Sequence, residues 1–258
     1  MTRILSGVAL AAVAVAAIWF LTPVALLGVA LVVAALAFTE YARIVGAIGA
    51  RVPWWTTLLL TLLACAMVPF PWIDPVVAIV FALITAAANV LVSDRVGGPT
   101  LSDTAAAVLA PVYIGLPLGA LVGVAAVAGR EAVLILIGTV ALSDTAQYYA
   151  GRTFGRHPLA PRRSPKKTIE GAIGGFVVAP IALLLAGATW LPGISPLRLA
   201  LVGVLLVAAG MIGDLFESML KRAADLKDSS DLIPGHGGVL DRIDALLFAA
   251  PVFYFFIR

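Results

Sequence analysis

The sequence predicts an all-α, polytopic integral membrane protein with about nine transmembrane helices. Apolar residues make up 62% of its 258 residues, charged residues make up 12%, and the mean hydropathy is +1.09. Soluble proteins carry about 25% charged residues, roughly twice this share. The chain has a single Cys and no long polar tract. These features exclude a disordered chain, a disulfide scaffold and a nucleic-acid-binding protein.

Breaker residues divide the apolar sequence into segments close to the length of about 20 residues that crosses a bilayer. The first apolar run is about 18 residues long, and another begins directly after Pro23, so we interpret the first as a span and not as a signal peptide. The predicted spans are 4–21, 23–39, 56–72, 75–93, 105–128, 131–150, 171–191, 197–216 and 243–257.

The basic residues predict the orientation of these spans. With nine spans, Arg130, Arg198 and Arg258 fall on one side, and the other 14 of the 17 Lys and Arg residues fall on the opposite side. The positive-inside rule makes the basic side cytoplasmic. We therefore expect a multi-pass protein of the cell membrane with a cytoplasmic N-terminus.

Charged residues are concentrated in two segments, 144–170 and 214–244, which lie on the cytoplasmic side of this topology. The chain is predicted to be a single membrane-embedded domain, 1–258. Residues 1–143 are expected to be mainly scaffold. Residues 144–258 are expected to be the catalytic half, with two cytoplasmic polar loops at 151–170 and 217–242. We expect the two segments to form one polar site.

Four aspartates in these segments are candidate metal ligands. Asp144 and Asp214 lie near the cytoplasmic ends of predicted spans, where a buried carboxylate costs about 2.5–3.5 kcal/mol; the alternative is that both are simply solvated at the interface. Asp241 and Asp244, three residues apart, share one helical face. Carboxylate oxygens are hard ligands that suit Mg²⁺ bound together with substrate phosphates.

Basic residues beside these aspartates suit a polyanionic ligand. They are Lys166, Lys167, Lys221, Arg222, Lys227 and Arg242. A topology signal and attraction to anionic lipids form the alternative, which suffices for Arg43, Arg51 and Arg95. His236, between Gly235 and Gly237, is a candidate phosphate donor, general base or structural hydrogen-bonding residue. His157 is interpreted as an ordinary loop histidine.

The second polar segment resembles the signature of the phosphatidate cytidylyltransferases, the CDP-diacylglycerol synthases of phospholipid biosynthesis. The matching residues are Ser218, Leu220, Lys221, Arg222, Lys227, Asp228, Ile233, Pro234, His236, Gly237, Gly238, Val239, Asp241, Arg242, Ile243 and Asp244. The first polar segment is similar to another loop of that family, in Ser164-Pro165-Lys166-Lys167-Thr168 and Glu170-Gly171. Over the first 140 residues the resemblance is only compositional.

This resemblance implies that the protein converts CTP and phosphatidate to CDP-diacylglycerol and pyrophosphate. It implies Mg²⁺ held by Asp214 and Asp241, with Asp244 and Asp144 as neighbours, and it leaves open a second, monovalent cation. It also implies a homodimer. The expected catalytic residues are Lys221, Arg222, Lys227, Asp228, His236 and Arg242. The expected substrate-binding residues are Ser164, Lys166, Lys167, Ser218, Gly237 and Gly238.

Two other functions compete with this interpretation. A CTP-dependent polyprenol or phytol kinase would also need Mg²⁺ and nucleotide phosphates, but it would release CDP. The complete signature argues against it. An ion-coupled transporter would use Asp144 and Asp214 as coupling sites, but transporters tend to show two related halves. Here the polar motifs lie in the second half of the chain.

Overall fold

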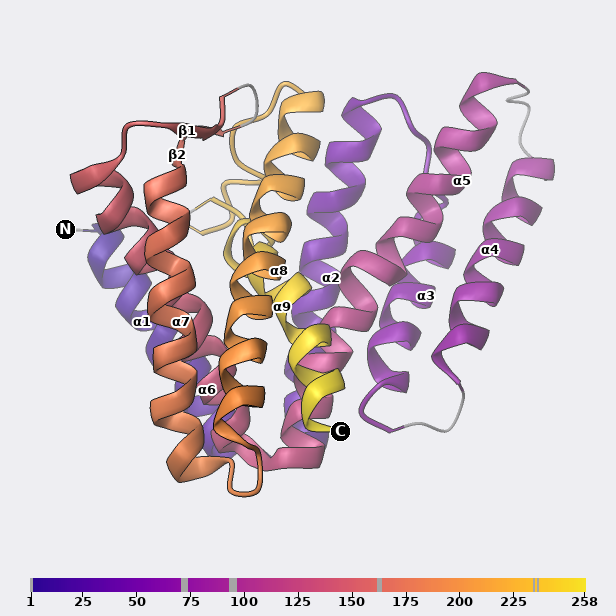
Figure 1. Ribbon diagram of the computed structural model, residues 1–258. Helices are drawn as coiled ribbons and strands as arrows, with labels where there is room; N and C mark the ends of the chain where they lie inside the picture. Colours follow the sequence, from indigo (N-terminus) through magenta and orange to yellow (C-terminus); the bar gives the residue numbers. More distant parts are fainter. Residues whose placement is uncertain (1, 71–73, 93–96, 162–163, 234, 236) are drawn as a thin grey trace.

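The computed structural model describes residues 2–70, 74–92, 97–161, 164–233, 235 and 237–258, and in this part the protein is almost entirely helical (Figure 1). Its helices run roughly side by side. Their bounds are α1 Thr2–Phe20, α2 Pro23–Ala47, α3 Trp54–Met67, α4 Pro75–Val92, α5 Gly98–Ala110, the π-helical turn η1 Pro111–Gly115, α6 Leu116–Phe154, α7 Ile169–Trp190, α8 Pro196–Ala223 and α9 Leu240–Ile257.

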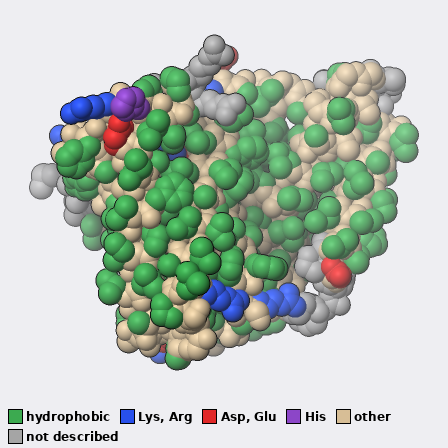
Figure 2. All heavy atoms as spheres, in the orientation of Figure 1, with side chains coloured by type: hydrophobic (Ala, Val, Ile, Leu, Met, Phe, Trp, Pro, Cys, Tyr) green, Lys and Arg blue, Asp and Glu red, His purple; other side chains and the backbone are tan. Residues whose placement is uncertain are grey.

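Hydrophobic side chains cover the flank of the molecule (Figure 2). Phe20, Leu185 and Phe255 are each more than two-thirds exposed, which is a typical state for side chains that face lipid. Four described helical segments are long and apolar enough to cross a membrane. They are Pro23–Ala47, Gly98–Phe154, Ile169–Trp190 and Pro196–Ala223, and shorter apolar helices accompany them. The prediction of an all-α membrane protein with several spans is confirmed.

Capping residues start two of these helices at the predicted breakers. The Thr22 hydroxyl accepts a hydrogen bond from the backbone N–H of Ala25 at 3.3 Å, and Pro23 occupies the first helical position. Ser195 and Pro196 begin α8 in the same way. A hydroxyl cap followed by Pro is a strong start signal, because Pro at this position loses no helical hydrogen bond.

Gly129 breaks α6 in two. Its φ of 86° and ψ of 173° are not helical, and glycine adopts this conformation without steric cost. The break falls between predicted spans 105–128 and 131–150. The first of these contains the π turn at Pro111, where the missing amide hydrogen disturbs the helical ladder.

The two polar segments lie at the same end of the helices, opposite the C-terminus (Figure 1). The first, predicted as a loop, contains a small antiparallel hairpin of β1 Pro158–Ala160 and β2 Ser164–Thr168. In the second, α8 remains helical to Ala223 and α9 begins at Leu240. Helix α2 ends at Ala47 instead of at 39, so its last two turns carry polar residues to this end.

Glycines let α7 and α8 pack closely, as small residues do in membrane helix pairs. A Cβ atom at Gly203 would lie 2.6 Å from the Pro180 Cα atom of α7. By contrast, a Cβ atom at Gly138 in α6 would have no non-local atom within 4 Å.

We therefore expect Gly203→Ala to lower the free energy of unfolding by about 1–3 kcal/mol, because the α7 backbone must move to admit a methyl group. Thermal unfolding of the purified protein in detergent measures this change. Gly138→Ala is the matched control and should be neutral or slightly stabilising, because alanine favours the helix. Equal unfolding temperatures for the two variants would contradict close α7–α8 packing.

Candidate active site

A cavity of about 560 Å³ lies at the polar end of the helices. It is lined by side chains from α6, the hairpin, α7, α8, the α8–α9 connection and α9. The lining residues are Asp144, Gln147, Tyr148, Gly151, Arg152, Leu159, Lys166, Lys167, Thr168, Gly171, Ala172, Asp214, Glu217, Lys221, Asp228, Asp241, Arg242 and Asp244. The two polar segments therefore share one cavity.

The end of α8 supplies one face of this cavity. Asp214, Glu217 and Lys221 are spaced three and four residues apart, so the helix presents them along one side. The Ser218 hydroxyl donates to Asp214 Oδ1 at 3.4 Å. Aromatic rings of Tyr113, Phe216 and Phe248 pack edge to face nearby. Helix α8 thus joins an apolar core to a charged cavity.

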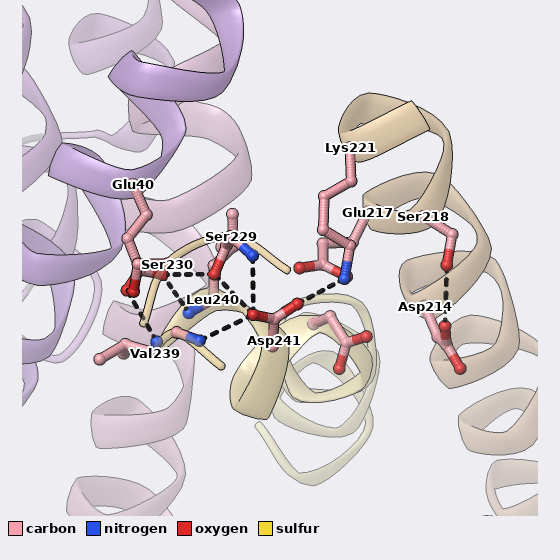
Figure 3. A network of polar contacts seen from close by, with 12 residues as sticks. Glu40, Asp214, Glu217, Ser218, Lys221, Ser229, Ser230, Val239, Leu240 and Asp241 are labelled. Atoms are coloured by element: carbon pink, nitrogen blue, oxygen red, sulfur yellow. Dashed lines mark hydrogen bonds and ion pairs between the residues drawn. The ribbon is translucent and has the colours of Figure 1, made fainter. Parts of the chain in front are cut away.

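Lys221 lies between two buried carboxylates (Figure 3). Its Nζ atom is 2.5 Å from Glu217 Oε2 and also contacts Asp241 Oδ1. The Glu217 side chain is 1% exposed and the Asp241 side chain is 6% exposed. Among described residues, Glu217 has no hydrogen-bond partner of standard geometry, so the Lys221 cation is what compensates its buried charge.

Asp241 receives several donors from the α8–α9 connection. Its Oδ2 atom accepts hydrogen bonds from the Ser229 N–H at 2.9 Å, the Ser229 hydroxyl at 2.8 Å and the Gly238 N–H at 2.8 Å. With Lys221 at Oδ1, these contacts approach the four acceptor positions of a carboxylate. Asp241 therefore holds the connection and Lys221 together.

Asp144, Asp214 and Asp244 also line the cavity. The Gln147 amide donates to Asp144 at 3.2 Å, and Lys167 Nζ lies 2.5 Å from Asp214 Oδ2. Each aspartate keeps acceptor positions to spare, so any one of them could act as a hard-oxygen ligand. Within the described ranges, no three His, Cys, Asp or Glu residues form a group that could hold a metal ion.

The hairpin brings Lys166 and Lys167 to the cavity. Glu170, at the start of α7, accepts hydrogen bonds from the backbone N–H groups of Arg156 and His157, and it contacts His157 Nδ1 at 2.6 Å. The Thr168 hydroxyl caps α7 through the N–H of Gly171 at 3.1 Å. His157 thus helps to fix the hairpin against α7.

Most predicted site residues with described positions line the cavity. They are Asp144, Lys166, Lys167, Asp214, Lys221, Asp228, Asp241, Arg242 and Asp244. Others are absent from the lining. These are Ser164 at the start of β2, Ser218 one turn after Asp214 on α8, the exposed residues Arg222 and Lys227, and Gly237 and Gly238 beside Asp241. His236 lies outside the described residues, as do Arg95, Arg162 and Arg163 of the orientation argument.

Three charged residues near the cavity are not predicted from the sequence as part of the site. Glu217 could have been found from its helical spacing to Asp214 and Lys221. Arg43 was attributed to topology, but its Nη2 atom donates to the Ser229 carbonyl at 2.7 Å. Glu40 is also buried against the α8–α9 connection. Arg43 and Glu40 belong to a segment that the sequence places outside any span.

Comparison with known proteins identifies the family. The sequence model of the cytidylyltransferase family matches residues 1–258, so the chain belongs to this family. It is 45% identical over 130 residues to the uncharacterized protein YnbB of Escherichia coli (strain K12), covering 50% of this chain and 43% of YnbB.

Two further relatives are named phosphatidate cytidylyltransferase. The one from Haemophilus influenzae is 44% identical over 122 residues, covering 45% of this chain and 42% of that protein. The one from Bacillus subtilis is 36% identical over 161 residues, covering 61% and 60%. The matched segments therefore span about half the length of these relatives.

Replacing Lys221 with Met should lower the free energy of unfolding by about 3–5 kcal/mol, because Glu217 and Asp241 would remain buried without their cation. Denaturant unfolding in detergent measures the loss. The double variant Lys221→Met/Glu217→Gln should lose less, because one of the unpaired charges is gone. Lys227→Met, at an exposed position, is the control. If Lys227→Met lowered the free energy of unfolding as much as Lys221→Met does, Lys221 would not be the stabilising cation.

Proposed function

We propose that the protein transfers the cytidylyl group of CTP to phosphatidate, producing CDP-diacylglycerol and pyrophosphate. The observation that carries this proposal is the single cavity in which lysines of the hairpin and of α8 face aspartates of three helices. Membership of the cytidylyltransferase family supports it, as do the relatives named phosphatidate cytidylyltransferase.

The reaction needs two polyanions held in line. An oxygen of the phosphatidate phosphate attacks the α-phosphorus of CTP. The bond from this phosphorus to the oxygen bridging the α- and β-phosphates breaks, and pyrophosphate leaves with the electron pair. The nucleophile is already anionic near pH 7, so the protein need not supply a base. Its role is to position both substrates and to stabilise the developing negative charge.

Cationic side chains on two sides of the cavity suit this role. Lys166 and Lys167 come from β2, whereas Lys221 and Arg242 come from α8 and α9. Lysine acts as a mobile point charge, and arginine can bind two phosphate oxygens at once. Lys221 would stabilise the leaving pyrophosphate. Lys167 would exchange Asp214 for a substrate phosphate.

Mg²⁺ is the cofactor that the remaining aspartates suit. One or two of Asp214, Asp244 and Asp144 would hold it together with the substrate phosphates, and the ion would neutralise charge on those phosphates. Asp241 was expected to be a principal ligand from the resemblance. Its contacts with Lys221, Ser229 and Gly238 instead favour a structural role for this carboxylate. A second, monovalent cation remains an expectation from the resemblance.

The arrangement of the helices supports a cytoplasmic cavity and nine spans with a cytoplasmic N-terminus. The two halves of α6 around Gly129 would form two separate spans, with α5 and η1 extending the first. CTP is a cytosolic nucleotide, and phosphatidate keeps its acyl chains in the bilayer, so a cavity at the cytoplasmic interface is accessible to both. We retain the homodimer as part of this proposal.

The test of this function is an assay of the purified protein with CTP, phosphatidate and Mg²⁺. We expect pyrophosphate and CDP-diacylglycerol in equal amounts, and a loss of at least about a hundredfold in turnover for Asp214→Asn, because an oxyanion ligand becomes a neutral amide. Glu131→Gln, beside the Gly129 break of α6 and outside the cavity, is the control and should retain full turnover. Release of CDP without pyrophosphate would instead indicate a kinase.

Orientation is tested by cysteine labelling in a Cys65→Ala background. A cysteine at Arg198 should react with a membrane-impermeant maleimide in intact cells, because the α7–α8 turn is expected outside. A cysteine at Arg156, beside the hairpin, should react only after the membrane is permeabilised. The reverse pattern would overturn the proposed orientation.

A further inference from the structure

Glu40 is a buried carboxylate in the N-terminal half of the chain. It lies in α2 after a long apolar stretch, and only 4% of its surface is exposed. A carboxylate in such a position is costly unless it is paired or hydrogen-bonded. Its partners all lie about two hundred residues later, in the connection that leads into α9 (Figure 3).

Four donor groups lie within hydrogen-bond distance of the two oxygens of Glu40. Oε1 accepts from the Ser230 hydroxyl at 2.6 Å and the Val239 N–H at 2.9 Å. Oε2 accepts from the Ser229 hydroxyl at 2.8 Å and the Leu240 N–H at 2.8 Å. Donors from one segment of chain therefore surround the carboxylate.

Two of these donors are the first amides of α9. Helix N-termini leave backbone N–H groups without partners inside the helix, and the N-cap residue Val239 has no polar side chain to supply one. Glu40 takes the place of a local cap, and its negative charge also favours the positive end of the helix dipole. Helix α9 thus begins at a point fixed by α2.

Ser229 connects Glu40 to the cavity. Its hydroxyl lies 2.8 Å from both Glu40 Oε2 and Asp241 Oδ2, so the two carboxylates share its single proton, and its backbone N–H donates to Asp241. Arg43, one turn along α2, holds the Ser229 carbonyl. A Cβ atom at Gly238 would overlap both the Ser229 hydroxyl and the Glu40 carboxylate, so glycine is needed where these groups meet.

We propose that Glu40 is a positioning residue for Lys221. By fixing Ser229 and the first turn of α9, Glu40 sets the place of Asp241, which in turn holds the Lys221 ammonium toward the cavity. This inference rests on the proposed function, in which Lys221 contacts the phosphates of CTP. It assigns part of the site to the half of the chain that the sequence predicts to be mainly scaffold.

The test is a double-mutant cycle on CTP binding, measured with radiolabelled CTP and the purified full-length protein. Glu40→Gln replaces an oxygen that accepts a backbone N–H by an amide that cannot, and we expect CTP binding to weaken about tenfold. Lys221→Met should weaken it to a similar degree. The double variant should bind no more weakly than Lys221→Met alone, because Glu40 acts through Lys221.

Two further variants separate positioning from general destabilisation. Asp103→Asn is the matched control, because Asp103 is a buried carboxylate, 5% exposed, that accepts the Arg51 N–H at 2.7 Å outside the cavity. It should leave CTP affinity unchanged. Glu40→Asp keeps the charge and both oxygens on a shorter side chain, so it should restore part of the affinity that Glu40→Gln loses.

Amide hydrogen exchange without substrate provides a readout that does not depend on the reaction. The Val239 and Leu240 amides should exchange faster in Glu40→Gln than in Asp103→Asn. Additive weakening of CTP binding in the double variant, about a hundredfold in total, would overturn the proposal. So would unchanged affinity in Glu40→Gln. If the unaltered protein binds CTP but forms no pyrophosphate, the proposed function falls while the binding cycle still tests Glu40.

Discussion

The ion pairs of Lys221 are the interaction on which the site depends. The chain has few charged residues. Moving a charged side chain out of water costs several kcal/mol unless an opposite charge is held at contact distance. Lys221 satisfies this condition for Glu217 on its own helix and for Asp241 on α9. The same contacts fix the relative position of α8 and α9. The ion pairs that compensate the buried charges therefore also hold these two walls of the cavity together.

The acidic residues of the cavity separate into two groups by their contacts. Asp241 and Glu217 are engaged by the protein itself, whereas Asp144, Asp214 and Asp244 keep oxygen atoms that a cation and phosphates can use. Identical side chains thus differ in what remains available to a ligand. Asp241 and Asp244 illustrate the distinction, because they lie three residues apart on α9 yet differ in how many donors already contact them.

The sequence predicts local features better than distant ones. Its breakers place the starts of α2 and α8 correctly, and the interval between 128 and 131 contains the Gly129 break. Helical spacing and the family resemblance predict that the aspartates and lysines lie together, and most of them line one cavity. Glu40 is different. It interrupts an apolar pattern, which suggests the end of a span. The groups that hydrogen-bond to its buried carboxylate lie far away in the sequence, so no local pattern predicts them. The hairpin at 158–168 also depends on a distant anchor, Glu170, and no strong strand pattern marks it.

The hydrogen bonds from α2 to the start of α9 have a consequence for biosynthesis. A membrane protein is inserted from its N-terminus as it is translated, so Glu40 enters the bilayer region long before the amides of Val239 and Leu240 exist. During that interval the carboxylate must stay hydrated at the membrane surface or find temporary partners. The cavity would then form only after the final helix is inserted, because a shorter nascent chain lacks both the partners of Glu40 and one wall of the cavity.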